Sequence, residues 1–529
     1  MKIYFNEIFL FLATIYFILV SLATFNIVGK YTLHFELFGL LVGILGVIAI
    51  IKQEKPIFNK KIIEKENIGE LLKLLLLVSI IIILATRIIP YFDNSIPLGY
   101  DPGIYKYSFE MYEQYLPNLP FTELDLWLQR SEPQGFFTLT NILYIFGFST
   151  DQIMIPFFIL TQLILGLIIY TITKHFFGKK EATIAIFLYA ISIIEFKVYW
   201  FFYIKNVLGL IFLLTSFYLY SKKKYLPAAL VAGFLAGTHR PTFFLFTIMF
   251  GLNFILDYKN LKNNLKTGLL ITFICLGFYI GKFDQLLFTI LIPTLQEPAG
   301  PGTFLDFFQY QFSILIYLPF AVMGGIYLFK QKEKRILLIG AIVCLVIVAF
   351  QLIFYNRFII FLEIFVLIIA AYGIKLFLEM DTKKVIQYFI LTLFIITSIF
   401  AIFQESTNST PLIIQEELDA IKLINTMTEQ NAKILVTNSH YSPWVKGYTT
   451  RITIAPGLFD EDKWNRTKWE YFWNSADENQ INSMLLDYEK PIYVFISSKS
   501  FGNNEKFQGN CFEKIILNNN ALLYKYICD

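Results

Sequence analysis

Long apolar stretches separated by short polar loops run through the chain from its N-terminus to about residue 403. A helix needs about 20 mostly apolar residues to cross a bilayer, and thirteen stretches approach or exceed that length. The sequence therefore predicts an α-helical polytopic membrane protein with about 13 transmembrane helices. The predicted spans are 5–28, 35–51, 71–90, 152–173, 182–199, 206–220, 225–240, 241–257, 267–290, 313–329, 336–354, 358–377 and 385–403.

The overall composition leads to the same fold class. Of the 529 residues, 56% are apolar and 16% are charged, whereas soluble proteins average about 45–50% and about 25%. These values exclude a water-soluble enzyme, a disordered chain and a small disulfide-rich secreted module. The 44 basic and 40 acidic residues nearly balance, so the net charge gives no reason to expect a nucleic-acid partner.

Basic residues concentrate in alternate loops between the predicted spans. Because cytoplasmic loops carry an excess of Lys and Arg, we predict a multi-pass cell-membrane protein with a cytoplasmic N-terminus and an extracytoplasmic C-terminal tail. Two outer loops, 91–151 and 291–312, are then long, and long ordered loops usually carry function. The apolar stretch 136–148 is too short to span, and we expect it to lie as a helix on the outer surface. The basic loops, with 21 Lys and Arg in total, are 52–70, 174–180, 221–224, 258–266, 330–335 and 375–384.

The composition changes to that of a soluble domain at about Gln404. We therefore predict two domains: a transmembrane domain over 1–403 and a small extracytoplasmic α/β domain over 404–529. The tail holds 12 basic and 16 acidic residues, which leaves 32 and 24 for the rest of the chain. The expected elements of the tail are a helix that starts near Pro411, buried strands over 433–437 and 491–496, and a hairpin over 512–517 and 521–527.

Two of the four cysteines flank this expected hairpin. With a two-residue Asn-Asn turn, Cys511 would lie directly opposite Cys528, at a spacing that a disulfide accepts. We therefore predict a Cys511–Cys528 disulfide, since the tail would lie in an oxidising compartment. The same register would oppose Lys514 to Lys525, which is unfavourable. The cysteines show no metal-ligand spacing, so no metal site is predicted.

The most distinctive local motif is 97–105 (PLGYDPGIY), directly after the third predicted span. Asp-Pro-Gly is typical of a turn, and a turn alone is the more common explanation of such a motif. The alternative is a carboxylate held at the membrane boundary, where partial burial raises its basicity. Asp101 is therefore the candidate general base.

An outer loop that opens with Gly-x-Asp-Pro and continues through surface helices into 131–136 (SEPQGF) resembles the first loop of the GT-C glycosyltransferases. A later segment, 356–360 (NRFII), is similar to the Arg-aromatic-aliphatic stretch that opens a late helix in many of these enzymes. The family uses polyprenyl-phosphate-linked sugars and includes protein O-mannosyltransferases and oligosaccharyltransferase catalytic subunits. The resemblance covers residues 71–403, without the family's prolines near 356–360, and the two helices before residue 71 are a departure from it.

The resemblance implies an inverting transfer of a sugar at the outer face of the membrane. Asp101 matches the family's first-loop aspartate, which is the general base in single-sugar transferases and a metal or acceptor ligand in oligosaccharyltransferases. Glu297 would take the place of the latter's later-loop glutamate by its loop position alone. The oligosaccharyltransferase acceptor motif Trp-Trp-Asp-Tyr-Gly is absent from the tail. Transfer of a single sugar is therefore favoured, and this reaction requires no divalent metal, although the cofactor stays open.

Three basic residues near the predicted outer helix ends are candidate substrate-binding residues. His239 and Arg240 lie where a lipid phosphate would lie, and arginine suits bidentate phosphate contacts. Interface residues that reach the lipid headgroups are an equally common explanation. Arg357 joins this group because it belongs to the family-like segment 356–360.

Two carboxylates and one aromatic residue complete the set of candidate substrate-binding residues. Glu195 and Glu363 lie inside predicted spans, where ionisable residues are functional suspects, although structural pairing would also explain them. Tyr105 is placed to stack on a sugar, although aromatic side chains that merely mark the membrane interface are more common.

The expected function is therefore a membrane glycosyltransferase that moves a sugar from a polyprenyl-phosphate-linked donor to a glycan, lipid or protein acceptor. Two alternatives stay open: oligosaccharyltransferase-like transfer of a lipid-linked glycan, and transport of such a glycan across the membrane. A transporter predicts internal repeats and helices broken at the midplane, and the sequence shows no repeat.

Overall fold

The computed structural model describes residues 2–25, 32–52, 65–116, 118, 125–131, 134–280, 307–329, 331, 335–353, 355–500 and 502–528. The chain forms two compact units. The helical unit comprises Met1–Phe92, Ile159–Tyr199 and Tyr203–Ser409, and the α/β unit comprises Asp93–Phe158, Trp200–Phe202 and Thr410–Asp529. The α/β unit thus includes residues 93–158 in addition to the tail, which differs from the division of the sequence at residue 404.

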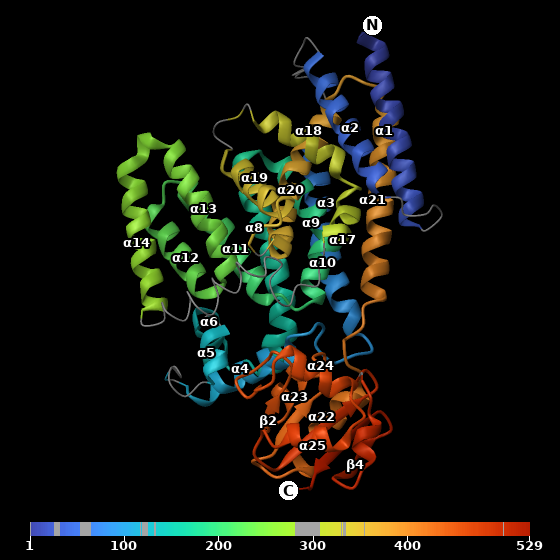
Figure 1. Ribbon diagram of the computed structural model, residues 1–529. Coiled ribbons are helices and arrows are strands. Elements are labelled where there is room, and N and C mark those ends of the chain that lie inside the picture. The colour runs from blue at the N-terminus through green and yellow to red at the C-terminus, as the bar shows by residue number, and fades with distance from the viewer. Residues whose placement is uncertain are drawn as a thin grey trace. The chain divides into compact units, whose positions relative to one another are not determined.

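The helical unit consists of helices that overlap every predicted span (Figure 1). Six described helices are long and apolar enough to cross a membrane, or seven if the bent pair α9 and α10 is one span. Residues 281–290 of the predicted span 267–290 lie outside the described residues. The helices are α1 (Lys2–Thr24), α2 (Thr32–Lys52), α3 (Lys65–Ile88), α8 (Phe158–Phe176), α9 (Lys179–Ile191), α10 (Ile193–Trp200), α11 (Ile204–Ser221), α12 (Tyr225–Thr238), α13 (Arg240–Leu256), α14 (Leu261–Tyr279), α17 (Phe307–Ile314), α18 (Leu318–Leu328), α19 (Arg335–Ala349), α20 (Tyr355–Glu379) and α21 (Lys384–Thr407).

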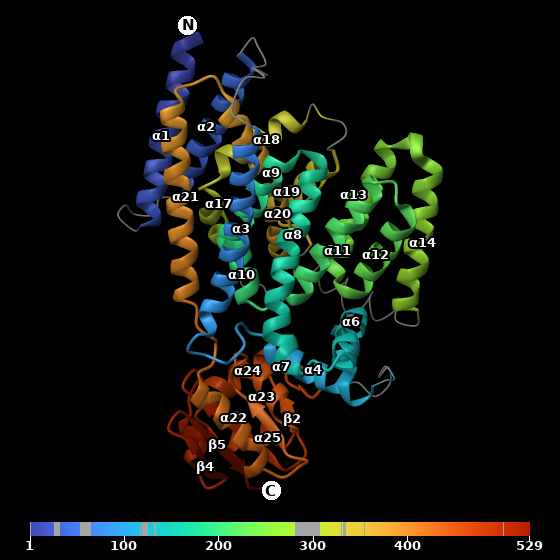
Figure 2. The same ribbon diagram turned by 180° about the vertical axis from the view of Figure 1, so that it is seen from behind.

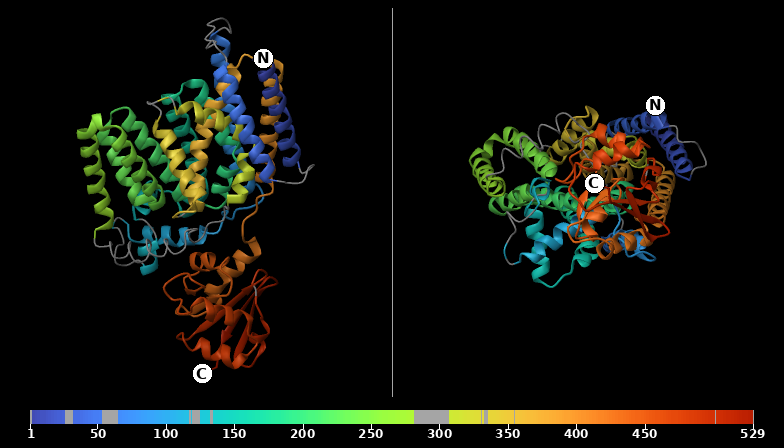
Figure 3. Two further views of the ribbon diagram at one scale, coloured as in Figure 1. Left: turned by 45° about the horizontal axis from the view of Figure 1, so that its top comes forward. Right: turned by 60° about the horizontal axis from the view of Figure 1, so that its bottom comes forward.

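Helix α20 is the centre of this unit, because it packs against α9, α18 and α19. The contact with α18 is close at Gly373, where a Cβ atom would lie 1.8 Å from the Phe320 carbonyl oxygen. Only glycine allows the two backbones to approach in this way, as small residues do in membrane helix pairs. The first helix, α1, lies beside α2 and α21 (Figure 2), and α11 to α14 form a neighbouring group (Figure 3).

Two of the apolar segments are interrupted inside the helical unit. Helices α9 and α10 meet at Ser192 with a bend of 52°, and α12 and α13 meet at His239, whose backbone is extended. Each break leaves backbone groups without partners in their own helix. In a membrane protein such ends are tolerated only where other protein groups or a lined cavity satisfy them. Both breaks are therefore places where polar side chains must gather.

The α/β unit contains a five-stranded sheet in the order β2-β1-β3-β5-β4. Strands β2, β1 and β3 are parallel, and β5 pairs antiparallel with both β3 and β4. The predicted strands 433–437 and 491–496 are present as β1 and β3, whereas β2 and α23 were not predicted. The elements of the tail are α22 (Gln415–Met427), β1 (Lys433–Val436), α23 (Ser442–Tyr448), β2 (Ile452–Ile454), α24 (Arg466–Asn474), α25 (Glu478–Leu485), β3 (Ile492–Ser497), β4 (Phe512–Asn518) and β5 (Ala521–Tyr526).

Residues 93–158 add four short helices to this unit. They are α4 (Pro102–Gln114), α5 (Leu126–Ser131), α6 (Gln134–Ile145) and α7 (Thr150–Gln152). The 12 residues of α6 cover about 18 Å at 1.5 Å per residue, which is too short to cross a bilayer. Ile145 and Phe146 at its end are 69% and 75% exposed, as an apolar helix on a membrane surface would require.

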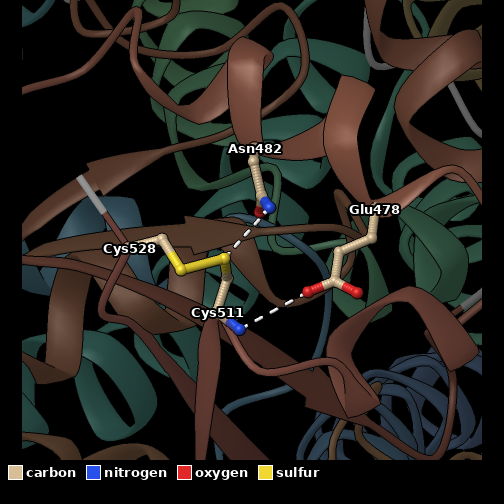
Figure 4. The surroundings of a disulfide bond; sticks show 4 residues. All are labelled: Glu478, Asn482, Cys511 and Cys528. Carbon is tan, nitrogen blue, oxygen red and sulfur yellow. Dashed lines mark hydrogen bonds between the residues drawn. A yellow bond between two sulfur atoms is a disulfide. The ribbon is translucent and has the colours of Figure 1, made fainter.

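A disulfide joins Cys511 to Cys528 and ties the start of β4 to the end of β5 (Figure 4). The predicted hairpin register, however, is wrong by one residue over most of its length. Asn518 faces Ala521 as expected, but a bulge between Ile516 and Asn518 shifts the rest of the pairing, so that Lys525 faces Glu513. The bulge removes the unfavourable pairing of Lys514 with Lys525 and replaces it with an opposite-charge pair, which stabilises the hairpin.

Glu417 is a buried carboxylate, 1% exposed, that joins α22 to the loops after β1 and β3. Its oxygens accept hydrogen bonds from Tyr441 Oη (2.7 Å), Ser498 Oγ (2.7 Å) and the Ile414 N–H (3.1 Å). Burial acts to raise the pKa of Glu417, but these hydrogen bonds and the charge of Lys499 outweigh it, so the pKa lies below its usual range.

Replacing Glu417 with Ala is expected to lower the free energy of unfolding of the α/β unit by about 2–3 kcal/mol at pH 7, because buried donors lose their acceptor. Since the folded pKa is depressed, the contribution is complete above the unfolded pKa of about 4.3 and disappears as the pH falls through the folded pKa. The mutant should therefore lose less stability on acidification than the wild type. All six tryptophans belong to the α/β unit, so tryptophan fluorescence during thermal unfolding measures this. Glu416→Ala, at the exposed neighbouring position, is the matched control.

Candidate functional site

Asp101 is the N-cap residue of α4, and its side chain is half-buried and does not cap the helix. The loop before it turns at Gly99, which has φ +89° and lies so close to the chain that a Cβ atom would be 2.7 Å from the carbonyl carbon of Phe201. Pro102 follows at the first helical position, where its fixed φ suits the start of a helix. The Gly-x-Asp-Pro motif therefore forms a rigid turn, and the Asp101 carboxylate is not needed to cap it.

The start of α4 crosses α23 at very short range. A Cβ atom on Gly103 would lie 1.9 Å from the Pro443 carbonyl oxygen, and one on Gly447 would lie 2.1 Å from the Gly103 carbonyl oxygen. Glycine at both positions lets the two backbones touch. This contact fixes the Asp101 turn against the tail.

Tyr100, next to Asp101, lies against the polar turn that follows β1. It makes a hydrogen bond with Ser439, and its ring centroid is 6.4 Å from that of the exposed His440. Burial, followed by the negative charge of Asp101, raises the pKa of Tyr100. Ligands of open α/β sheets commonly bind outside the carboxyl ends of parallel strands, and the Asp101 turn lies at this edge.

An ion pair links residues 93–158 to α23 a short distance away. Lys446 Nζ lies 2.8 Å from Asp125 Oδ2, which also accepts a hydrogen bond of 2.6 Å from Tyr107 Oη. Burial acts to raise the pKa of Asp125, but Lys446 and Tyr107 more than offset it and the pKa is lowered. The ion pair holds residues 93–158 and the tail together.

Tyr105 is a core residue of the α/β unit and not an exposed platform for a sugar. It is 3% exposed, and its ring centroid lies 5.3 Å from that of Phe202 and 5.8 Å from that of Phe136. The amphipathic spacing of α4 turns this position inward, which the local motif alone did not indicate.

His239 in the helical unit lies in the break between α12 and α13 and is 3% exposed. Its Nδ1 atom lies 2.6 Å from Thr242 Oγ1, which fixes the orientation of the ring. Its Nε2 atom has no hydrogen-bond partner among the described residues. Helix α11 approaches through Gly209, where a Cβ atom would lie 2.8 Å from Thr242 Oγ1. A buried, oriented and unsatisfied nitrogen indicates a ligand-binding position.

Three positively charged side chains lie near enough to His239 to act on it electrostatically. The charges of Arg357, Lys205 and Arg240 all act on its imidazole. The ring of His239 also meets Phe361 of α20 at a centroid distance of 6.3 Å. Arg240 in turn lies over the ring of Tyr279, 5.9 Å from its centroid. The sequence predicted His239, Arg240 and Arg357 as substrate-binding residues. In the structure, Arg240 and Arg357 both lie near enough to act on His239.

Each of these cations belongs to the first turn of a helix. Lys205 is the second residue of α11, Arg240 the first of α13 and Arg357 the third of α20. Helix N-termini carry partial positive charge and free N–H groups, and they bind anions such as phosphate. These helix N-termini and their three cationic side chains are therefore a candidate anion site.

Glu195 and Glu363 lie elsewhere in the helical unit, and both are 0% exposed. Glu363 accepts hydrogen bonds from Ser192 Oγ (2.6 Å) and from Tyr317 Oη. Neither oxygen of Glu195 has a hydrogen-bond partner among the described residues. Glu297 lies outside the residues that the structure describes. Within the described ranges no three His, Cys, Asp or Glu side chains gather in a way that would hold a metal ion.

Residues 131–280 match the family model of dolichyl-phosphate-mannose-protein mannosyltransferases (PMT_2). The fold is similar to that of ArnT from Cupriavidus metallidurans in the apo state, with a TM-score of 0.54 and 10% identity over 87% of this chain and 98% of that chain. The chain has the GT-C fold, and its residues 131–280 resemble a mannosyltransferase domain. The sequence resemblance to this superfamily is thereby confirmed.

The fold is also similar to that of a second GT-C structure. Archaeal oligosaccharyltransferase AglB from Archaeoglobus fulgidus, solved with an inhibitory peptide and a dolichol-phosphate, has a TM-score of 0.58 and 14% identity over 80% of this chain and 69% of that chain. ArnT bound to undecaprenyl phosphate has a TM-score of 0.52 and 10% identity over 85% of this chain and 97% of that chain. No curated protein sequence matches the chain.

Several residues of this GT-C protein were not predicted as site residues. Lys205 is one of them, although a basic residue between two predicted spans, 182–199 and 206–220, is a signal that the sequence does carry. Ser439 and His440 follow the end of the predicted strand 433–437, so the sequence carried a signal for them as well. Ser192 and Tyr317, by contrast, are ordinary residues of apolar segments, and only the fold shows that they meet Glu363.

Proposed function

We propose that this glycosyltransferase moves a single sugar from a polyprenyl-phosphate-linked donor to an acceptor hydroxyl at the outer face of the membrane, with inversion at the anomeric carbon. One observation carries the proposal: three cations in the first turns of helices act on the imidazole of His239, whose Nε2 atom has no hydrogen-bond partner among the described residues. We assign Lys205, His239, Arg240 and Arg357 to one anion site. A phosphate is the anion that fits cationic side chains and free helix N–H groups inside a membrane protein.

The donor phosphate would be the leaving group at this site. His239 Nε2 and the two guanidinium groups would donate hydrogen bonds to its oxygens, and the charges would stabilise the negative charge that develops as the sugar–phosphate bond breaks. ArnT binds undecaprenyl phosphate in a similar fold, which supports a lipid phosphate over a nucleotide.

Asp101 would be the general base of the reaction. The acceptor oxygen forms a bond to the anomeric carbon, the bond from that carbon to the phosphate oxygen breaks, and the acceptor proton passes to the Asp101 carboxylate. The rigid Gly99–Pro102 turn supports this role, because it fixes the backbone that carries the Asp101 carboxylate. No step requires a metal ion, and Glu297 stays a candidate by loop position alone.

The likeness to AglB favours a second candidate, oligosaccharyltransferase-like transfer of a whole lipid-linked glycan. The turn after β1, where Tyr100 meets the tail, reads Thr437-Asn438-Ser439-His440-Tyr441 and not Trp-Trp-Asp-Tyr-Gly. The single-sugar reaction is therefore the better-supported proposal. A transporter or flippase for lipid-linked glycans has no observation of its own in its favour.

The experiment is a transfer assay with the purified full chain in detergent. Radiolabelled polyprenyl-phosphate sugars are supplied with glycan, lipid or peptide acceptors, and label in the acceptor is measured. A transferase forms a covalent labelled product in micelles, whereas a flippase has no membrane to act across. Label that stays on the lipid with every donor and acceptor would contradict the proposal.

We also propose that the tail is extracytoplasmic, that the N-terminus is cytoplasmic and that thirteen segments span the cell membrane. The loop charge asymmetry supports this orientation, and so does the disulfide, since disulfides persist in oxidising compartments.

In intact cells, an impermeant maleimide is expected to label Cys511 and Cys528 only after an impermeant phosphine reductant is added. Cys275 and Cys344 are replaced by Ser and Ala to remove background. Two added labels per chain, counted by mass shift, are the expected result. Labelling that requires permeabilised cells would place the tail in the cytoplasm.

A further inference from the structure

Two helix breaks of the helical unit meet at one side chain, that of Glu363 on α20. The first break is the 52° bend at Ser192 between α9 and α10. The second lies between α17 and α18, where Leu315–Tyr317 leave the helix. Both breaks direct a hydroxyl group to the same carboxylate oxygen.

The contacts at the first break form a short chain. The Glu195 N–H donates to Ser192 Oγ (3.2 Å), and Ser192 Oγ donates to Glu363 Oε1 (2.6 Å). The carboxylate thus acts on the N-terminus of α10 through a serine hydroxyl, at the helix end that favours negative charge. At the second break, Tyr317 Oη donates to the same Glu363 oxygen. Glu363 therefore fixes the starting points of two half-helices.

The surroundings of this carboxylate are buried and charged. Ser192 is 1% exposed and Tyr317 is 3% exposed. Glu363 and Arg87 both act electrostatically on Glu195, whose oxygens have no hydrogen-bond partner within the described ranges. Losing one partner of such a buried polar cluster leaves the others unsatisfied, and the helices then shift to compensate.

The elements held by Glu363 carry the anion site. Helix α10 leads through Trp200–Phe202 to Lys205 at the start of α11. Arg357 lies six residues before Glu363 on α20, about 9 Å along the axis at 1.5 Å per residue. Between them, Phe361 of the same helix contacts the ring of His239. A displacement at Glu363 therefore moves Arg357 directly and Lys205 through α10.

We propose that Glu363 is a positioning residue for the donor phosphate: its hydrogen bonds to Ser192 and Tyr317 hold the helices that present Arg357 and Lys205 to the phosphate. The inference rests on the proposed function, since it assigns the anion site to the donor. Glu363 itself does not touch the donor, and its effect passes through the position of the cations. A displacement of about 1 Å in such a site can lower a rate about 100-fold.

The test compares Glu363→Leu, Glu363→Gln and Tyr317→Phe in the full chain. Two quantities are measured: the affinity for undecaprenyl phosphate, which needs no turnover, and the donor KM in the transfer assay. Glu363→Leu and Tyr317→Phe are expected to weaken both about 10-fold and to leave the acceptor KM unchanged. Glu363→Gln retains an oxygen that accepts from Ser192 and Tyr317, so it should restore most of the affinity.

The matched control is Thr397→Val, which removes another buried hydrogen bond between helices, the 2.8 Å contact of Thr397 with Ser21. It should lower the thermal stability and leave phosphate affinity unchanged. If Tyr317→Phe and a folded Glu363→Leu bind undecaprenyl phosphate as the wild type does, or if Glu363→Gln fails as Glu363→Leu does, the positioning role is wrong. Tyr317→Phe decides the question if Glu363→Leu does not fold. A wild type that binds the phosphate but transfers no sugar would contradict the proposed function and not this inference.

Discussion

Replacing Asp101 with Asn is expected to lower the rate of sugar transfer about 10²–10⁴-fold, the usual loss when a general base is removed. Asn has nearly the same size as Asp and forms turns equally well. The turn itself is fixed by Gly99, Pro102 and the contact of Gly103 with Pro443, so the mutant should fold normally. The mutation therefore removes the basic oxygen and little else.

The measurement is kcat with saturating donor and acceptor, with tryptophan fluorescence as the check on folding. The donor KM should change little, because the base acts on the acceptor. Asp93→Asn is the matched control, since Asp93 is an exposed aspartate of the same segment and has no role in the proposed reaction. A folded Asp101→Asn protein with wild-type kcat would leave the motif as a turn only.

Removing the cations of the anion site is expected to have the second-largest effect. Arg240→Gln or Arg357→Gln alone should raise the donor KM or lower kcat/KM about 10- to 100-fold, since a hydrogen bond to a charged group contributes about 1.5–3 kcal/mol. The double variant should lose about 10³-fold, although neighbouring sites need not add. The acceptor KM should stay unchanged.

The control for this pair is Arg335→Gln, which removes an arginine from the first turn of α19, on a loop that is predicted to be cytoplasmic. It makes the same change of charge at the same position in a helix, but it lies outside the anion site. The measurement is donor dependence at fixed acceptor, together with undecaprenyl phosphate binding. Normal donor kinetics in the double variant would make His239, Arg240 and Arg357 interface residues and remove the main support for a phosphate leaving group.

The sequence alone determined the fold class and the position of the helices. Spans are long apolar runs whose length is set by the bilayer, so every one of the thirteen segments overlaps a helix. Strands β1 and β3 were equally readable, because parallel strands buried on both faces form continuous apolar runs. The short β2 and α23 were missed, since three to seven residues carry too little periodicity.

Part of the candidate site was also visible in the sequence. Gly-x-Asp-Pro specifies a rigid turn through local backbone chemistry, and His239, Arg240 and Pro241 are adjacent in the chain. The disulfide partners could be chosen because they flank one hairpin. The register could not be predicted, because the bulge between Ile516 and Asn518 decides whether Glu513 or Lys514 faces Lys525, and this depends on the whole sheet.

Only the tertiary structure decided which distant residues act together. Lys205 and Arg357 join His239 because three helices start at one place, and no spacing in the sequence encodes that meeting. Tyr105 proved to be buried, and Glu363 proved to join two helix breaks, because burial and pairing depend on neighbours contributed by other helices. Local motifs follow from backbone and turn chemistry. A charged cluster inside a helix bundle depends instead on tertiary packing, which no single stretch of the sequence determines.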